Sequence, residues 1–275
     1  MKGFNRLLCP ICHGKLSSNG KSLSCGKNHS FDISSDGYVN LAVGKSGSGD
    51  ALDMCRARRD FLSRGYYLPF AESVSEEAGK FAPKSSPLVC DAGCGEGFYL
   101  RVMKKNLADF EFIGFDLAKD SIRFAAKAEK NSPFPITYAV SGIFDMPLSP
   151  SSCSAVISIF APIPHEEAER ILVEDGILLV AHPGEKHLSG FKKNLYDVPY
   201  DNEEKELHFP NFELVHEKRV KYTVFIEKSD MKNLLLMTPY YWKTSREDTD
   251  RFLTLNGFET ELDFIISVFK KSRKM

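Results

Sequence analysis

The chain has 275 residues, of which 43% are hydrophobic and 27% charged, and this composition is typical of globular proteins and excludes disordered and fibrous chains. Thirty-six lysines and arginines oppose 37 aspartates and glutamates, so the formal charge of -1 argues against a nonspecific nucleic-acid binder. No apolar run reaches the ~18 residues that cross a bilayer, and no signal-peptide pattern follows Met1. We therefore expect a cytoplasmic protein.

The amino-terminal part of the chain differs in charge from the rest. Before Asp32 it contains no carboxylate side chain, and its formal charge of +5 comes from Lys2, Arg6, Lys15, Lys21 and Lys27. This charge favours either contact with RNA phosphates or an ordinary solvated surface, and both interpretations stay open. The Gly/Ser-rich residues 44–50 are typical of a linker. The sequence thus predicts a head at residues 1–43, a linker at 44–50 and a second domain at 51–275.

Four side chains in the head have the spacing of a zinc site, C-x2-C-x12-C-x3-H, and they are Cys9, Cys12, Cys25 and His29. Because the chain has seven cysteines and no export signal, we expect metal ligation or burial and no disulfide framework. Three thiolates and one imidazole fill the tetrahedral shell of Zn²⁺ without an open position, so the predicted zinc is structural. His13 is a rival ligand. A redox Cys-x-x-Cys pair is the competing interpretation, which we discount because it precedes any βαβ pattern.

The second domain begins with helical patterns and continues with alternating strands and helices. Helices are predicted at residues 51–64, 69–81, 98–105, 122–129 and 165–173, the last ending before Gly176. Short apolar runs that suit buried strands occur at residues 88–92, 110–115, 136–140, 155–160 and 177–181. After His187 the pattern is less regular, with strands predicted at residues 212–226 and 262–269 and a helix at 229–237. We expect an α/β fold with a doubly wound, mainly parallel sheet covered on both faces.

A glycine-rich loop, Asp91-Ala92-Gly93-Cys94-Gly95-Glu96-Gly97, joins the first of these strands to a helix. Glycines allow a sharp turn and a close approach of a ligand to the backbone. A dinucleotide fingerprint would need glycine at position 98, where Phe98 stands. The loop carries Asp91 and Glu96 and no basic residue, which would repel a pyrophosphate but suit cationic S-adenosylmethionine.

Asp116 ends the second strand of the alternating region, 23 positions after Gly93. A carboxylate there can accept hydrogen bonds from both hydroxyls of a ribose. The alternative is an anion at the start of the next helix, favoured by the helix dipole, and both roles are compatible. Strand, glycine loop, helix and acidic strand end together indicate a class I methyltransferase. At the end of the third strand, where many methyltransferases have an acidic residue near the adenine amine, Ser141 is the expected contact.

The zinc quartet and the glycine loop in one chain resemble the RlmA family of 23S rRNA (guanine-N1)-methyltransferases. The resemblance runs nearly from end to end and also includes Phe31-Asp32, Gly37-Tyr38-Val39-Asn40-Leu41, Ala57-Arg58-Arg59, Phe61-Leu62, Gly65, Tyr67, Ala161-Pro162, Pro183-Gly184, His187-Leu188 and Met237-Thr238-Pro239. It implies methyl transfer from S-adenosylmethionine to N1 of a guanine in a hairpin loop of 23S rRNA. It further implies that the zinc head helps to bind RNA and that the protein is a homodimer.

The resemblance also assigns cofactor contacts residue by residue. Gly95 and Glu96 fall at the cofactor loop, and Tyr67 and His187 fall at positions expected to contact the cofactor. Without the resemblance we would interpret Tyr67 as a core aromatic residue and His187 as a surface or helix-capping residue. These residues are added to those inferred from the glycine loop and the strand ends. The expected contacts with the cofactor are then Tyr67, Asp91, Gly93, Gly95, Glu96, Gly97, Asp116, Ser141 and His187.

The catalytic residues are not identified by the sequence. The segment Phe160-Ala161-Pro162 should line the substrate pocket, where Phe160 either stacks on the base or, as we favour, belongs to the core. Guanine N1 must lose a proton, and the candidate acceptors are Asp145, His165 and Glu166, besides water. The arginines Arg56, Arg58, Arg59 and Arg64 are expected either to meet phosphates or to pair with Asp53 and Asp60.

Two alternative functions stay open from the residues alone. One is a small-molecule methyltransferase with a structural zinc head, and the other is a zinc-dependent RNA-binding protein without turnover. The cysteines outside the head have no spacing that suggests chemistry, so burial is predicted for Cys55, Cys90, Cys94 and Cys153. An aromatic cluster at residues 240–242 either stacks on RNA or, as we favour, packs in the core or in a dimer interface.

Overall fold

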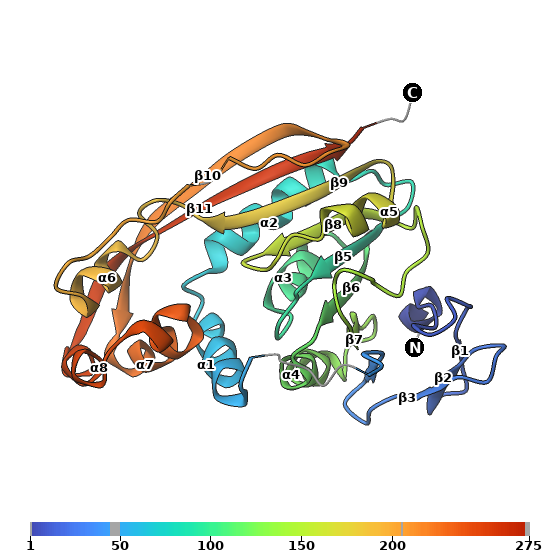
Figure 1. Ribbon diagram of the computed structural model, residues 1–275, viewed down its shortest axis with the longest axis horizontal. Helices are drawn as coiled ribbons and strands as arrows, with labels where there is room; N and C mark the ends of the chain where they lie inside the picture. The colour runs from blue at the N-terminus through green and yellow to red at the C-terminus, as the bar shows by residue number, and fades with distance from the viewer. Residues whose placement is uncertain (1, 45–49, 205, 273–275) are drawn as a thin grey trace.

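A large mixed sheet forms the centre of the molecule (Figure 1). The computed structural model describes residues 2–44, 50–204 and 206–272. The strands of this sheet are β4 (Tyr38–Asn40), β5 (Leu88–Ala92), β6 (Glu111–Asp116), β7 (Thr137–Val140), β8 (Cys153–Ile159), β9 (Leu172–Pro183), β10 (Phe212–Glu227) and β11 (Gly257–Lys271). Their spatial order is β10-β11-β9-β8-β5-β6-β7-β4. Strands β4 to β9 are parallel, whereas β11 is antiparallel to β9 and β10 is antiparallel to β11, which confirms the predicted mainly parallel α/β sheet.

Helices cover one face of this sheet. They include α1 (Leu52–Ser63), α2 (Leu68–Phe81), α3 (Phe98–Asn106) and α4 (Lys119–Glu129). Their apolar side chains, among them Phe61, Phe70 and Leu100, pack in one core with Val89 of β5. Because β5 and β8 are buried on both faces, their sequences are mostly apolar and do not alternate regularly between apolar and exposed polar residues.

The amino-terminal segment covers part of the opposite face. It consists of a 3₁₀ helix η1 (Lys2–Arg6) and a small sheet of β1 (Ser17–Ser18), β2 (Ser22–Ser24) and β3 (Ser30–Asp32). Leu7 and Leu23 of this segment are fully buried in one core with Ile113 and Phe115 of β6. The helix α5 (His165–Ile171) contributes to the same core. The zinc-ligand segment therefore packs directly on the large sheet.

The predicted boundary after residue 43 does not coincide with a break in the large sheet. Strand β4 lies within the predicted head, yet it pairs in parallel with β7, with Tyr38 opposite Tyr138. Residues 45–49, most of the predicted linker, lie outside the described residues. The division into head, linker and second domain stays a prediction.

The predicted elements between residues 51 and 181 are all present, with one notable shift. Strand β9 begins at Leu172 and contains Gly176, the residue that we expected to end a helix. Asp175 has a left-handed φ of 63°, and the pairing of β8 with β9 changes register between Cys153 and Ala155. This irregular pairing keeps a polar stretch inside a strand, which apolar periodicity does not detect.

A helical insertion between β10 and β11 was only partly predicted. It contains α7 (Lys228–Met237), the 3₁₀ helix η2 (Pro239–Lys243) and α8 (Arg246–Leu253), and α6 (Ser189–Leu195) packs nearby on β11. Buried Asp230 of α7 accepts hydrogen bonds from Arg64 Nε at 3.0 Å and Tyr66 Oη at 2.9 Å. These bonds tie the insertion to the turn between α1 and α2.

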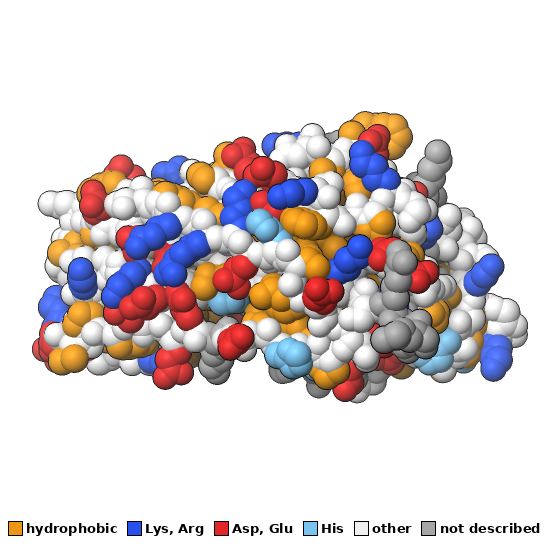
Figure 2. Space-filling view, turned by 90° about the horizontal axis from the view of Figure 1, so that it is seen from above, with side chains coloured by type: hydrophobic (Ala, Val, Ile, Leu, Met, Phe, Trp, Pro, Cys, Tyr) orange, Lys and Arg blue, Asp and Glu red, His pale blue; other side chains and the backbone are white. Residues whose placement is uncertain are grey.

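The outer strand β10 pairs only with β11 among the described residues. Figure 2, seen from above, shows basic and acidic side chains mixed over this face. Charged side chains along a free strand edge oppose unwanted pairing with other chains, and several of those on β10 are in ion pairs, including Lys218 with Glu77 and Lys221 with Glu261. In the part of the chain that the structure describes, no helix is long and apolar enough to cross a membrane.

Candidate cofactor cavity and metal centre

The glycine loop turns sharply at the carboxyl end of β5. Gly97 begins α3 with a left-handed φ of 78°, and a Cβ at this position would lie 2.3 Å from Tyr138 Oη. Gly95 also has a positive φ of 53°, but a Cβ there would meet only Arg58 Nη1, at 3.9 Å. Gly97 is thus required by packing and backbone conformation, whereas Gly95 leaves an open side toward a ligand.

A cavity of about 800 Å³ lies beside this loop, at the carboxyl ends of the parallel strands. In open α/β sheets this edge is where ligands bind, and the volume suits a small-molecule cofactor. The walls are formed by the loop residues Gly93 to Glu96, by Asp116 and Leu117, by residues 142–145 and 159–162, by Asp50, Arg58, Leu62, Tyr67, Tyr99, Pro183, His187 and Leu188, and by residues 237–240.

Two buried carboxylates, Asp91 and Glu96, and the partly buried Asp116 give the loop and its surroundings an acidic character. Glu96 and Asp116 line the cavity, and burial raises the pKa of each above its ordinary value. Asp91 is the second-last residue of β5 and lies two positions before Gly93, the first loop residue in the cavity wall; among the described residues neither of its side-chain oxygens has a hydrogen-bond partner. Burial raises the pKa of Asp91 well above its usual range. Such a site is completed by a cationic ligand, and S-adenosylmethionine, with its sulfonium and ammonium groups, fits it.

Asp116 has two backbone donors in the structure. Its Oδ2 accepts from Gly95 N–H at 2.9 Å and its Oδ1 from Ala118 N–H at 2.7 Å, next to the start of α4. The predicted anion at the helix start is therefore present. The predicted contact with ribose hydroxyls remains compatible, since a carboxylate can accept about four hydrogen bonds.

Replacing Asp116 with alanine should weaken binding of S-adenosylhomocysteine by ~1–3 kcal/mol, because both the predicted ribose contact and the hydrogen bond to the loop at Gly95 would be lost. Isothermal calorimetry measures this affinity. Asp120→Ala is a matched control, since Asp120 is on α4, pairs with Arg123 and does not line the cavity. If the Asp116 variant binds S-adenosylhomocysteine as tightly as the wild type, the assignment of Asp116 to the ribose hydroxyls is wrong.

Tyr67 and His187 meet in the cavity wall, which the sequence without the resemblance did not suggest. Tyr67 Oη lies 3.2 Å from His187 Nε2, and His187 Nδ1 accepts from Asp263 N–H at 3.3 Å. Because Nδ1 accepts, the neutral imidazole carries its proton on Nε2 and donates it to Tyr67 Oη. Burial lowers the pKa of His187 to about 3, so the ring is neutral at physiological pH. The hydroxyl proton of Tyr67 is therefore available to donate a hydrogen bond to a ligand.

Asp263 fixes the loop that carries His187, and sequence reasoning did not identify it. Its side chain is fully buried and accepts two hydrogen bonds from Arg219, at 2.8 and 2.6 Å, and one from Lys186 N–H at 3.0 Å. Burial alone would raise the pKa of Asp263, but these hydrogen bonds lower it below its ordinary value. The available signal was a single carboxylate within the apolar run of a predicted strand.

The remaining predicted residues are only partly brought together. Ser141 is buried, but its side chain bonds to Gly142 O and it does not line the cavity, which Gly142 and Asp145 do. Arg56 and Arg59 pair with Asp53 and Asp60, as the alternative interpretation expected. Arg64 pairs instead with Asp230, a partner that was not predicted. The cysteines outside the head, Cys55, Cys90, Cys94 and Cys153, are buried as predicted.

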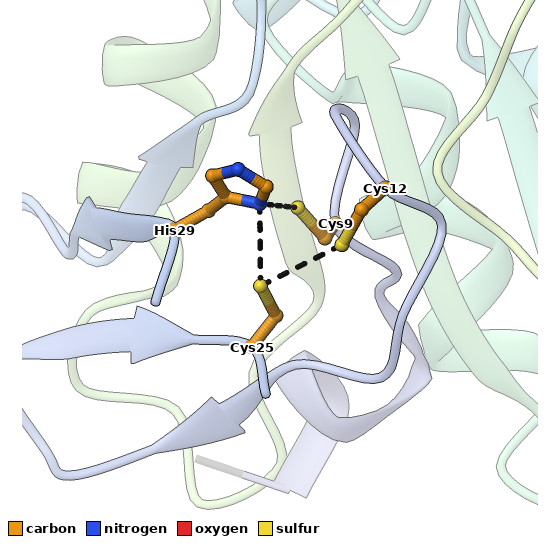
Figure 3. A group of neighbouring side chains, drawn as sticks. All are labelled: Cys9, Cys12, Cys25 and His29. Carbon is orange, nitrogen blue, oxygen red and sulfur yellow. Dashed lines mark hydrogen bonds between the residues drawn. The ribbon is translucent and has the colours of Figure 1, made fainter. Parts of the chain in front are cut away.

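The four predicted zinc ligands converge on one point, as Figure 3 shows. Cys9 and Cys25 Sγ each lie 3.4 Å from His29 Nδ1, and Cys12 Sγ lies 3.6 Å from Cys25 Sγ. Zn–S bonds of about 2.3 Å in a tetrahedron place two sulfurs about 3.8 Å apart, so this donor set fits zinc. Desolvation raises the pKa of Cys25, but hydrogen bonds from backbone N–H groups outweigh it and lower the pKa to about 6, which favours the thiolate ligand. The rival His13 is outside the cluster.

Comparison with known proteins decides the family. The model of the RlmA amino-terminal zinc ribbon matches residues 7–43, and a methyltransferase domain model matches residues 89–176. A 23S rRNA (guanine(748)-N(1))-methyltransferase of Streptomyces fradiae is 30% identical over 252 residues, which cover 89% of each chain. The chain belongs to the 23S rRNA (guanine-N1)-methyltransferase family.

A second curated relative agrees with this membership. A Bacillus subtilis (strain 168) protein, provisionally named a 23S rRNA (guanine-N(1)-)-methyltransferase, is 28% identical over 98% of each chain. Among solved structures, the YcgJ protein of Bacillus subtilis aligns with a TM-score of 0.49 and 14% identity over 74% of this chain and 99% of its own. The resemblance inferred from the sequence is confirmed. This member of the family is a methyltransferase, its cofactor is S-adenosylmethionine, and its zinc is structural.

Proposed function

We propose that the chain transfers a methyl group from S-adenosylmethionine to N1 of a guanine in a hairpin loop of 23S rRNA. The observation that carries this proposal is the presence in one chain of the family's zinc ribbon and of an acidic cavity at the carboxyl ends of the parallel strands. The cofactor supplies the methyl group when bound. We assign its charged and ribose groups to Glu96 and Asp116 of the cavity wall and to Asp91, which is buried before the loop, with Tyr67 and His187 beside them.

Phe160 is the residue that we assign to the target base. The core position that we favoured from the sequence is wrong, because Phe160 lines the cavity and 43% of its surface is exposed. It has a left-handed φ of 53°, a strained conformation for a bulky residue and one that often marks a functional position. Its ring lies 6.4 Å from that of Tyr67 and 6.1 Å from that of His187. An exposed ring in a cavity next to the cofactor is suited to stacking on an unpaired guanine.

The proton of guanine N1 must leave as the new bond to carbon forms. Of the three predicted acceptors, Asp145 lines the cavity and has no hydrogen bond or ion pair among the described residues. His165 instead stacks on Phe209 at 5.3 Å, and Glu166 is exposed; neither lines the cavity. His187 is neutral with both ring nitrogens engaged. Asp145 or a water molecule is therefore the acceptor that we propose.

The Phe160→Ala variant should lose roughly 10- to 100-fold in kcat/KM for 23S rRNA, because a base–aromatic stack contributes about 1–3 kcal/mol. Its affinity for S-adenosylhomocysteine should stay unchanged, since we assign the ring to the target base and not to the cofactor. Labelled methyl transfer and calorimetry measure the two quantities. Phe134→Ala is the control, because Phe134 is also an exposed phenylalanine but lies outside the cavity. An equal loss of kcat/KM in both variants would contradict the assignment of Phe160 to stacking on the target base.

The decisive test of the proposed reaction uses the wild-type protein. Unmodified 23S rRNA is incubated with the protein and S-adenosylmethionine and then copied by reverse transcriptase. A methyl group on N1 blocks Watson–Crick pairing, so we expect a single new stop at a guanine of a hairpin loop. Transfer of label to tRNA or to small metabolites, without a stop in 23S rRNA, would contradict the proposal.

We further propose that the amino-terminal head contributes to RNA binding and that the protein acts as a homodimer. The head's acid-free basic sequence favours contact with phosphates. Binding of 23S rRNA fragments at increasing salt concentrations would test the first point, and sedimentation equilibrium the second. Binding that does not weaken with salt, or a monomer at all concentrations, would contradict them.

A further inference from the structure

Arg58 is the residue on which we base a further inference. Among the described residues that line the cavity, Arg58 and His187 are the only basic side chains, and His187 is neutral. The sequence led us to consider Arg58 for contact with RNA phosphates. Its side chain instead turns into the cavity wall, where 28% of it is exposed.

Only one of the guanidinium nitrogens of Arg58 is engaged. Its Nη1 donates to Asp50 Oδ2 at 2.5 Å, whereas Nε and Nη2 have no hydrogen-bond partner among the described residues. A guanidinium presents five N–H donors in a planar fork, so it can bind a second carboxylate while it keeps the first. Although burial opposes it, the negative charges of Asp50, Glu96 and Asp116 raise the pKa of Arg58 above its ordinary value. The group is always charged.

The position of Arg58 is next to the open side of the glycine loop. Its Nη1 lies 3.9 Å from the place that a Cβ on Gly95 would occupy, and nothing else is near that place. The amino-acid end of S-adenosylmethionine is a zwitterion with one ammonium and one carboxylate group. The acidic residues of the cavity suit the ammonium group, and among the described wall residues Arg58 alone offers a permanent positive charge to the carboxylate.

We propose that Arg58 binds the carboxylate of the amino-acid end of the cofactor, while Asp50 holds the guanidinium in place through Nη1. This inference rests on the cofactor of the proposed function but not on its RNA substrate. It assigns to Arg58 a binding role distinct from that of its neighbour Arg59, which pairs with Asp60 and lies over the ring of Phe124.

Two ligands that differ only in the amino-acid part test this assignment by calorimetry. S-adenosylhomocysteine contains the carboxylate and ammonium groups, whereas 5′-methylthioadenosine has the adenosine and the thioether without them. For Arg58→Ala we expect a loss of roughly 10- to 100-fold in affinity for S-adenosylhomocysteine. Affinity for 5′-methylthioadenosine should change by less than about threefold. Arg59→Ala, the matched control on the same helix, should leave both affinities unchanged.

Further variants separate a binding role from a structural one. Arg58→Lys keeps the charge but not the fork, so it should recover part of the lost affinity and should fold if the alanine variant does not. Decarboxylated S-adenosylhomocysteine, which keeps the amine, should bind the wild type and Arg58→Lys equally well. An equal loss for S-adenosylhomocysteine and 5′-methylthioadenosine would overturn the proposal, because Arg58 would then only support the fold.

The outcome can be distinguished from failure of the proposed function. If the wild type binds S-adenosylhomocysteine in the expected way but leaves 23S rRNA unmethylated, the substrate is wrong and the assignment of Arg58 stands. If the wild type binds 5′-methylthioadenosine as tightly as S-adenosylhomocysteine, no group recognises the amino-acid end and the assignment of Arg58 is overturned.

Discussion

Replacing Cys25 with serine should release the zinc ion and destabilise far more than the metal site itself. A structural zinc contributes its binding free energy to folding, and three remaining ligands hold it poorly. Cys25 and Cys9 are buried in the same core as Ile113 and Phe115 of the large sheet. Without the metal, the segment that covers these side chains loses its internal support. We expect a loss on the order of 5 kcal/mol in the free energy of unfolding and a melting temperature lower by about 10 °C or more.

Metal analysis and thermal denaturation measure these two effects of Cys25→Ser. Affinity for S-adenosylhomocysteine should change by less than about threefold, because none of the four ligands lines the cavity. His13→Ala is the matched control, since His13 follows Cys12 directly but is outside the cluster, and it should retain zinc. A Cys25→Ser protein that still binds one zinc ion per chain would show that the ligand assignment is wrong.

Replacing Asp263 with alanine should disturb the cavity from a distance. The substitution removes the acceptor of Lys186 N–H and leaves Arg219 without its buried partner. The loop that ends at His187 would then lose an anchor, although Asp263 N–H still donates to His187 Nδ1. Because Arg219 is partly exposed, the expected destabilisation is about 2–4 kcal/mol, near the lower end of the range for a broken buried pair. Binding of S-adenosylhomocysteine should weaken in parallel.

Urea denaturation and calorimetry separate these two consequences of Asp263→Ala. Asp263→Asn keeps an acceptor for Lys186 N–H but not the charge, so it should lie between the wild type and the alanine variant in both measurements. Glu261→Ala is the control on the same strand, since the Glu261 side chain pairs with partly exposed Lys221. If Asp263→Ala lowers stability without affecting ligand affinity, the residue supports the sheet and does not position His187.

Several features of this protein follow from short-range patterns in its sequence. The zinc quartet was predictable because four ligands at fixed spacings can reach one metal ion through two tight turns, and the structure places all four together. The glycine loop was predictable because left-handed backbone at Gly95 and Gly97 excludes most other residues. The alternating strands and helices between residues 51 and 181 follow from apolar periodicity, which is also a pattern among residues close together in the sequence.

The tertiary structure alone decided which distant side chains share a surface. In the folded chain, Phe160 is exposed in the cavity, Arg58 lies next to Gly95, and Asp263 contacts the loop that carries His187. The tertiary structure also packs the zinc segment on β6, where the sequence suggested a separate head. These contacts join residues far apart in the chain, and their free energy depends on the burial and charge of both partners. A sequence pattern records only one partner at a time, so it cannot establish them.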